Sequence, residues 1–188
     1  MKTLIITIIS LFLNAAAALA SVTDHVNPFV GSSNYGTTNP GAICPNGMMS
    51  VTPFNVMGSE TNRFDKDSRW WSTPYSSDNS FFTGFSHVNL SGVGCPEVGI
   101  ILTMPTTGEV NPDYHIYGSE MHDQQAEPGW YSCMLGSYGI RAEATATTRT
   151  CVERYTYPEG RSNILINLGE GLTNETGAWL RKVSETEI

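Results

Sequence analysis

Arg69 and the two tryptophans that follow it form a cluster whose side chains could bind a sugar. Aromatic rings pack against the C–H face of a sugar ring, and a guanidinium group donates hydrogen bonds to hydroxyls. Adjacent residues of an extended chain point to opposite faces, so Trp70 and Trp71 cannot both fill one core. We therefore expect one of the two indole rings to face a ligand or a partner surface.

Two segments rich in Gly, Pro, Asn and aromatic residues flank this cluster, at residues 27–49 and 84–99. Long loops on a rigid scaffold are where ligand contacts usually lie. His87 falls in the second segment. Its simplest role is to order the loop by hydrogen bonding, and contact with a substrate is the main alternative.

Nucleophilic catalysis finds little support in these segments. Ser86 or Ser91 beside His87 would suggest a serine hydrolase, but Ser91-Gly-Val-Gly lacks the G-x-S-x-G nucleophile elbow. A Cys95 nucleophile is disfavoured, because an exported thiol is expected to be oxidised or buried.

The sequence also gives little support for a calcium site. Asp65, Asp67 and Asp78 cannot be matched to an EF-hand loop with its required glycine, so we expect them to be surface charges. The residues themselves therefore predict no catalytic group and no metal ligand in this chain.

Residues 1–20 have the pattern of a cleavable secretory signal. Lys2 precedes the apolar run Leu4–Leu13, and Ala18-Leu19-Ala20 gives the small-x-small site before Ser21. The apolar run is shorter than the roughly 20 residues that cross a membrane. We expect a secreted or periplasmic domain at residues 21–188, without a membrane span.

The four cysteines would then meet an oxidising compartment. Four cysteines allow three pairings, and the sequence does not choose among them. Cys133 and Cys151 lie in neighbouring strand-like runs and are the favoured candidates for a disulfide.

The charge balance limits the partners. The 188 residues carry 10 Lys+Arg and 18 Asp+Glu, for a net charge of −8, and no basic run interrupts them. Nucleic acids and anionic membranes require basic patches, so neither is an expected partner.

Short apolar or alternating runs separated by turn residues predict an all-β domain of two packed antiparallel sheets, an antiparallel β-sandwich. Residues 140–147 alternate most clearly, with Ile140, Ala142 and Ala144 on one face. The predicted strands are 48–53, 81–85, 98–104, 130–135, 140–148, 151–157, 164–168 and 178–183.

Four motifs in this order resemble the N-terminal domain of glycoside hydrolase family 92, a family of exo-acting α-mannosidases. They are Asn27-Pro-Phe-Val-Gly31, Pro40-Gly-Ala-Ile-Cys-Pro-Asn-Gly-Met48, Gly84-Phe-Ser-His-Val-Asn-Leu-Ser-Gly-Val-Gly-Cys95 and Leu102-Thr-Met-Pro-Thr-Thr-Gly108. The resemblance runs from about Val26 to Ile188 and implies a galactose-mutarotase-like β-sandwich.

The resemblance also implies calcium-dependent, inverting hydrolysis of α-mannoside glycans. In such a reaction one carboxylic acid protonates the leaving oxygen while a second carboxylate activates water. The family places these carboxylates and the calcium ligands in a C-terminal helical-barrel domain, normally on the same polypeptide. We therefore expect the catalytic residues and the calcium ligands outside this chain.

In this family the N-terminal domain forms part of the pocket wall. The resemblance implies hydroxyl hydrogen bonding by Arg69 and His87, aromatic packing by Trp71 and close backbone approach at Gly94. The full set of expected sugar-contacting residues is Phe29, Gly31, Arg69, Trp71, His87, Gly94 and Cys95.

We thus expect a partner-dependent fragment that is inactive alone, and the end at Arg181–Ile188, without a polar tail, favours truncation. A stand-alone carbohydrate-binding or protein-interaction module is the alternative. The fragment and the stand-alone module should differ in their exposed surface, because a domain that docks on another should expose a large apolar patch. We expect that patch around Trp70, Trp71, Phe81 and Phe82.

Overall fold

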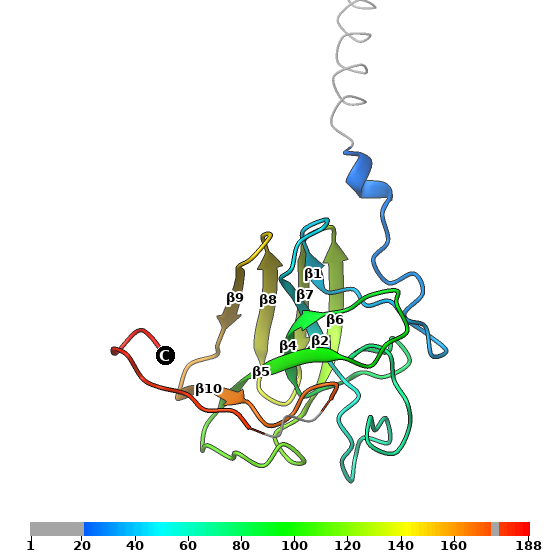
Figure 1. Ribbon diagram of the computed structural model, residues 1–188. Coiled ribbons are helices and arrows are strands. Elements are labelled where there is room, and N and C mark those ends of the chain that lie inside the picture. The colour runs from blue at the N-terminus through cyan, green and yellow to red at the C-terminus, as the bar shows by residue number, and fades with distance from the viewer. Residues whose placement is uncertain (1–20, 174–176) are drawn as a thin grey trace, which may run out of the picture.

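The computed structural model describes residues 21–173 and 177–188, and in this part of the chain ten strands form two antiparallel sheets (Figure 1). The first sheet has the order β1 (Ala42–Ile43), β2 (Ser50–Phe54), β4 (Gly84–Asn89), β5 (Val98–Thr107) and β10 (Ser162–Asn167). The second has the order β3 (Phe81–Phe82), β6 (Ser119–Glu127), β7 (Trp130–Leu135), β8 (Ile140–Ala146) and β9 (Cys151–Thr156). The predicted all-β class and the two-sheet architecture are confirmed.

A single 3-10 turn, η1 (Val22–His25), precedes the first strand. The predicted signal peptide, residues 1–20, lies outside the described residues. Within residues 21–173 and 177–188, no helix is long and apolar enough to cross a membrane.

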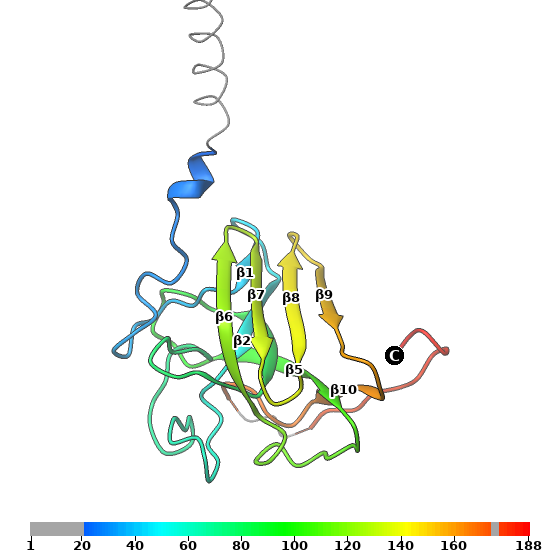
Figure 2. The ribbon, with the colours of Figure 1, turned by 180° about the vertical axis from the view of Figure 1, so that it is seen from behind.

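The two sheets pack with their strands crossing, as β5 does over β7 and β8 in Figures 1 and 2. The space between them is filled by side chains from both sheets, among them Phe85 and Met104 from the first and Tyr131 and Leu135 from the second. The edge-on contacts of Phe85 with Phe82 and Tyr131, with ring centroids 5.1 and 6.0 Å apart, are typical of aromatic packing. This core fixes the scaffold from which the loops project.

Strand β8 shows how the sequence pattern becomes structure. Ile140, Ala142 and Ala144 are buried against the core, while Arg141 and Glu143 are partly exposed on the other face. β8 pairs with β7 and β9 along its length, so the period-2 pattern determines which face is covered.

Strand β6 is absent from the sequence prediction. Its residues, Ser-Glu-Met-His-Asp-Gln-Gln-Ala-Glu, are almost all polar, and Met121 is one of only two positions in it with a buried side chain. A register shift between His122 and Gln125, with Asp123 at φ 50°, breaks the alternation further. Pairing with β7 holds this strand in place, which no local pattern reveals.

Two other segments differ from expectation. Residues 86–89 were expected in a loop, but together with Gly84 and Phe85 they form β4, an almost wholly buried central strand between β2 and β5. Residues 178–183 were expected to form a strand but have no regular structure, and Trp179 is 79% exposed.

The predicted Cys133–Cys151 disulfide is wrong for this structure, in which all four cysteines are free thiols. β8 lies between the strands that carry the two residues, and Cys133 pairs with Ala142 whereas Cys151 pairs with Ala146. Two strand spacings alone separate them by about 10 Å. A disulfide requires Cα atoms within roughly 7 Å.

The expected apolar patch around the tryptophans is also not formed. Trp71 and Phe82 are buried and Phe81 is partly buried, so Trp70, which is 53% exposed, stands alone. Among the described residues, the exposed large apolar side chains on the sheets and near the end of the chain are Ile43, Ile101, Val152, Ile164, Trp179, Leu180, Val183 and Ile188.

Candidate functional site

Three loops lie on the same side of the sandwich, away from the C-terminus (Figures 1 and 2). They are residues 27–41, 55–80 and 90–97, and the first contacts both of the others. Gly92 N–H donates to Thr37 O over 2.6 Å, and Asn39 Nδ2 donates to Leu90 O over 3.2 Å. Asn34 N–H donates to Asp78 Oδ2 over 2.8 Å. The two Gly-rich segments singled out in the sequence are therefore neighbours in space.

The first loop is shaped by its glycine and anchored by its phenylalanine. Gly31 has φ 81°, and a Cβ at this position would lie 2.8 Å from Thr38 Oγ1. The Thr38 hydroxyl in turn donates to Val30 O over 2.8 Å, which closes the loop. Phe29 is partly buried and packs against the main core. Both residues shape the loop, and their expected contact with sugar stays a prediction.

Gly94 and Cys95 lie in the third loop. Gly94 has φ 68°, a conformation that favours glycine, and a Cβ there would make only an ordinary contact, 3.9 Å from Thr37 Cγ2. Cys95 is an exposed free thiol.

The second loop is held by buried asparagine side chains. Asn55 Nδ2 donates to the carbonyls of Ser76 and Asn79, each over 2.7 Å, and Asn55 Oδ1 accepts from Ser76 N–H over 2.8 Å. Asn62 Nδ2 donates to Met57 O over 2.7 Å. These bonds replace a regular ladder across residues 55–80 and fix the position of Arg69 and Trp71.

Trp71 forms the floor of a cleft between the first two loops. Its side chain is 7% exposed, and the rings of Tyr35 and Phe64 pack on it with centroids 5.2 and 5.6 Å away. Its Nε1 is buried and has no hydrogen-bond partner among the described residues. The indole that faces solvent is Trp70, which does not line this cleft.

Arg69 lies above this floor. Its guanidinium is 5.2 Å from the centroid of the Tyr35 ring, and Nη1 donates to the Tyr35 hydroxyl. The cleft has a volume of about 550 Å³ and is open to solvent. We call it the two-arginine cleft and define it by Asn34, Tyr35, Arg63, Phe64, Ser68, Arg69, Trp71 and Asp78.

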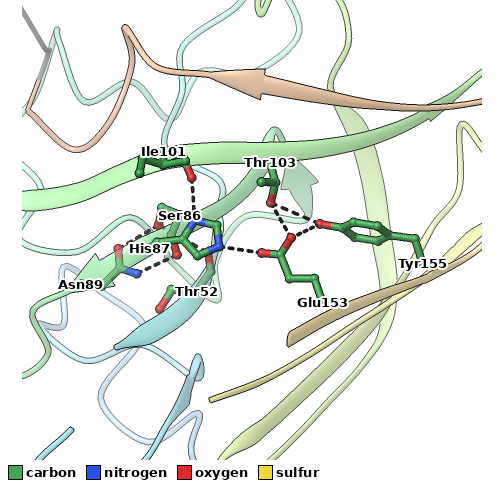
Figure 3. A network of polar contacts seen from close by, with 8 residues as sticks. All are labelled: Thr52, Ser86, His87, Asn89, Ile101, Thr103, Glu153 and Tyr155. Carbon is green, nitrogen blue, oxygen red and sulfur yellow. Dashed lines mark hydrogen bonds and ion pairs between the residues drawn. The ribbon is translucent and has the colours of Figure 1, made fainter. Parts of the chain in front are cut away.

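His87 lies elsewhere, between the two sheets (Figure 3). Its Nδ1 is 2.6 Å from Ile101 O and its Nε2 is 2.8 Å from Glu153 Oε1. A carbonyl and a carboxylate are both hydrogen-bond acceptors, so this geometry suits a ring that donates from both nitrogens, as an imidazolium does. No ring nitrogen remains for a sugar hydroxyl, and we do not assign His87 to the sugar-binding surface.

Glu153 completes a polar network that joins the sheets. Its Oε2 accepts from Thr103 Oγ1 over 2.8 Å and from the Tyr155 hydroxyl over 2.6 Å (Figure 3). Burial alone lowers the pKa of His87, but the hydrogen bond and charge of Glu153, with the Ile101 carbonyl, raise it above its ordinary value. Burial and the charge of Glu153 raise the pKa of Tyr155, which keeps that phenol a donor.

The serine hydrolase alternative finds no support in this geometry. Ser86 Oγ donates to Asn89 Oδ1 over 2.8 Å, and Asn89 Nδ2 donates back to Ser86 O over 2.8 Å. The imidazole of His87 is directed to Glu153 on the other sheet. Ser86 and His87 therefore do not form a nucleophile–base pair.

In residues 21–173 and 177–188 no three His, Cys, Asp or Glu side chains come together as possible metal ligands. Asp65 and Asp67 line a separate cleft, whereas Asp78 lines the two-arginine cleft. The described residues therefore do not fit a calcium ion.

Only Arg69 and Trp71 of the two-arginine cleft belong to the predicted site, and its other aromatic and basic members were not predicted. Tyr35 lies within the first Gly-rich segment, so the sequence predicts a functional loop there but does not single out the Tyr35 ring. Arg63 and Phe64 carry no local signal, because a loop without periodicity gives no indication of which side chains it turns inward.

A family model described as the glycosyl hydrolase family 92 N-terminal domain matches residues 25–188. A protein of Arthroderma benhamiae described as an uncharacterized secreted glycosidase is 27% identical over 160 residues, which are 79% of this chain and 19% of the relative.

Solved structures of the same family also match this chain. A family 92 alpha-mannosidase from Bacteroides thetaiotaomicron, solved in complex with mannoimidazole, superposes with a TM-score of 0.69 at 34% identity. That match covers 81% of this chain and 20% of the mannosidase. A second family 92 glycosyl hydrolase, at 30% identity, gives a TM-score of 0.68 over 81% of this chain and 21% of its own.

This chain thus spans about a fifth of the length of these relatives. The match to the family model covers most of the sequence, and the observed sandwich agrees with the fold of the solved members. The chain belongs to glycosyl hydrolase family 92, whose N-terminal β-sandwich domain it contains.

Proposed function

We propose that this chain is the sugar-contacting N-terminal part of a secreted, calcium-dependent exo-α-mannosidase and that it does not cleave mannosides alone. The observation that carries the proposal is the two-arginine cleft, in which Arg69 and Trp71 combine a guanidinium with aromatic surface. This combination suits a sugar ring with hydroxyls on one side and C–H bonds on the other. The mannosidase from Bacteroides thetaiotaomicron supports mannosides as the substrate class.

In this proposal Arg69 orients the sugar. The Tyr35 ring and hydroxyl restrain its guanidinium, so fewer rotamers are lost when it binds hydroxyl groups. Tyr35 and Phe64 pack on Trp71 and hold the floor of the cleft in place.

The proton transfers are assigned to other parts of the enzyme. Inverting hydrolysis requires one carboxyl group as acid and another as base, on opposite sides of the sugar with room for a water. We assign both, with the calcium ligands, to the remainder of the family 92 enzyme, because the described residues do not fit a calcium ion.

A stand-alone carbohydrate-binding module is the second candidate, and the burial of Trp71 and Phe82 favours it. A domain without the expected apolar patch has less need of a partner. Such a module would keep the two-arginine cleft but would lack the catalytic half.

The test compares the exported product of the complete gene with residues 21–188 alone. We expect the complete product to hydrolyse an aryl α-mannoside, to lose this activity to a calcium chelator, and to regain it when calcium is added. We expect residues 21–188 to be inactive under all three conditions. Turnover by residues 21–188 would contradict the proposal, and a complete product that binds mannose without hydrolysis would favour the second candidate.

A further inference from the structure

The hairpin formed by β4 and β5 carries the third loop, residues 90–97, and its backbone is strained on both sides of that loop. Val88, Val98 and Ile101 have φ values of 56°, 59° and 55°. A β-branched residue rarely adopts this left-handed conformation, which persists only where the surrounding structure enforces it. The contacts around these residues must therefore hold the hairpin in place.

Ile101 lies in a β-bulge. The register between β4 and β5 shifts between Phe85 and His87, which leaves β5 with one more residue than β4 in this stretch. The carbonyl oxygen of Ile101 is 2.6 Å from His87 Nδ1 (Figure 3). A carbonyl only accepts hydrogen bonds, so the imidazole donates to the bulge and stabilises it.

The other ring nitrogen joins this hairpin to the second sheet. His87 Nε2 is 2.8 Å from Glu153 Oε1, and Glu153 Oε2 accepts from Thr103 Oγ1 of β5 over 2.8 Å (Figure 3). The side chains of His87 and Glu153 are 9% and 12% exposed, so little water competes for these bonds. One carboxylate on β9 thus binds both strands of the hairpin.

The third loop extends directly from this anchored part of the hairpin, between the strained Val88 and Val98. At its far side Gly92 N–H donates to Thr37 O of the first loop over 2.6 Å. The first loop also supplies Tyr35 to the two-arginine cleft. A change in the position of the third loop is therefore transmitted to the loop that lines the cleft.

Glu153 is the charge that faces His87. β2 and β5, the neighbours of His87 in the first sheet, contain no titratable residue, and β8 turns its two charged side chains to the outer face of its sheet. On β9, Cys151 and Tyr155 share the inner face with Glu153. Burial raises the pKa of both groups, which favours their neutral forms.

Loss of the ring proton disrupts this arrangement. A neutral imidazole has one N–H and one lone pair, so it can donate to Ile101 O or to Glu153 but not to both. The remaining acceptor then faces a lone pair in a buried site, which is unfavourable. Burial lowers the pKa of His87, but Glu153 and the Ile101 carbonyl raise it above its ordinary value, so the proton is lost on the alkaline side.

We infer that His87 and Glu153 are positioning residues, whose ion pair holds the strained hairpin and the third loop in the sugar-binding arrangement until loss of the His87 proton at alkaline pH releases the loop. The effect on sugar binding rests on the proposed function and deepens it, because it limits the pH range in which this part of the enzyme binds. The position of the loop can be measured whether or not a sugar binds.

The experiment follows hydrogen exchange in the exported full-length protein from pH 5 to pH 10 by mass spectrometry, with rates corrected for the pH dependence of unstructured amides. We expect protection of the amides of residues 88–98 to fall about tenfold or more, while the amides of β8 stay protected. The midpoint of this change should lie above pH 6.5, the ordinary pKa of histidine.

Variants identify the groups responsible. Glu153→Gln should move the midpoint down by about one pH unit or more, because it removes the charge that retains the ring proton. Arg154→Gln, on the same strand but at an exposed ion pair, should keep the native midpoint. In His87→Gln the titrating group is absent, so exchange of the third loop should no longer depend on pH.

Calorimetry with mannose gives the second measurement. The apparent dissociation constant rises as the fraction of molecules with the loop in place falls, so we expect mannose to bind the native protein about tenfold more weakly at the alkaline end of the range. In His87→Gln the affinity should change little with pH.

Exchange of the third loop that does not depend on pH in the native protein would overturn the inference and leave the proposed function intact, and this result requires no variant to fold. An unchanged midpoint in Glu153→Gln would also overturn it, because another group would then be titrating. A released loop with unchanged mannose affinity would overturn the role of the pair in binding. Absence of mannose binding at every pH would refute the proposed function, whereas the exchange data would still decide whether the pair positions the loop.

Discussion

Replacing Glu153 with Gln removes the negative charge that His87 faces between the sheets while keeping the shape of the side chain. In the native protein the two side chains are 9% and 12% exposed, with Nε2 and Oε1 2.8 Å apart. Removing one partner of a buried ion pair costs about 3–5 kcal/mol, because the other charge is left uncompensated. His87 can lose its proton, so we expect the lower end, about 3 kcal/mol, from the free energy of unfolding.

The loss should depend on pH in one direction. The pKa of His87 is raised in the folded protein, so the stability contributed by its charge is fully present below its unfolded value of 6.5. That contribution disappears as the pH rises through the raised pKa. The difference between native protein and Glu153→Gln should therefore be largest near pH 6 and smaller at alkaline pH.

The assay is urea unfolding of both proteins across this pH range, followed by tryptophan fluorescence. Arg154→Gln is the matched control, because Arg154 lies on the same strand and pairs with Glu143 at an exposed site. We expect this control to lose less than about 1 kcal/mol. A loss of less than about 1 kcal/mol for Glu153→Gln at pH 6, or a loss that grows with pH, would refute the reasoning.

Two further predictions concern the loops and the cysteines. Gly31→Ala should lower the free energy of unfolding by about 1–3 kcal/mol, because the residue has φ 81° and an added Cβ would meet Thr38. Gly108→Ala is the control: its φ is 76°, but an added Cβ would enter open space, so the loss of stability should be smaller. Equal losses of the two variants in chemical unfolding would contradict the role of the Thr38 contact. Cys95 should react with a maleimide within minutes while Cys133 does not, because burial raises the pKa of the Cys133 thiol to about 12. Peptide mapping by mass spectrometry checks both thiols, and a disulfide-linked Cys133–Cys151 peptide would contradict the strand register.

The fold could be predicted from sequence where the pattern is local. The alternation at Ile140, Ala142 and Ala144 predicts both a strand and its buried face, and the structure confirms both. β6 could not be predicted, because its polar residues are ordered by pairing with β7 and not by their own periodicity. The disulfide error has the same origin, since proximity in sequence does not say which strand lies between two cysteines.

The site could be predicted only in part, for a related reason. Composition identified the loop that carries Tyr35, and the Arg69-Trp70-Trp71 run identified Arg69 and Trp71, but neither could show that Arg63 faces the same cleft. His87 was noted for its loop, whereas its partner Glu153 is 66 residues away on the other sheet. Contacts of this kind depend on how the sheets pack, and a sequence motif does not predict that packing.

The most direct test of a sugar-contacting role is the rate of α-mannoside hydrolysis by the exported full-length enzyme with Arg69→Gln or Trp70→Ala. Arg69 lines the two-arginine cleft, whereas the neighbouring Trp70 is exposed outside it. The account predicts that Arg69→Gln lowers kcat/KM by roughly 10- to 100-fold, the effect of losing charge-assisted hydrogen bonds, and that Trp70→Ala leaves it nearly unchanged. An unchanged kcat/KM in Arg69→Gln, or an equal loss in both variants, would contradict it.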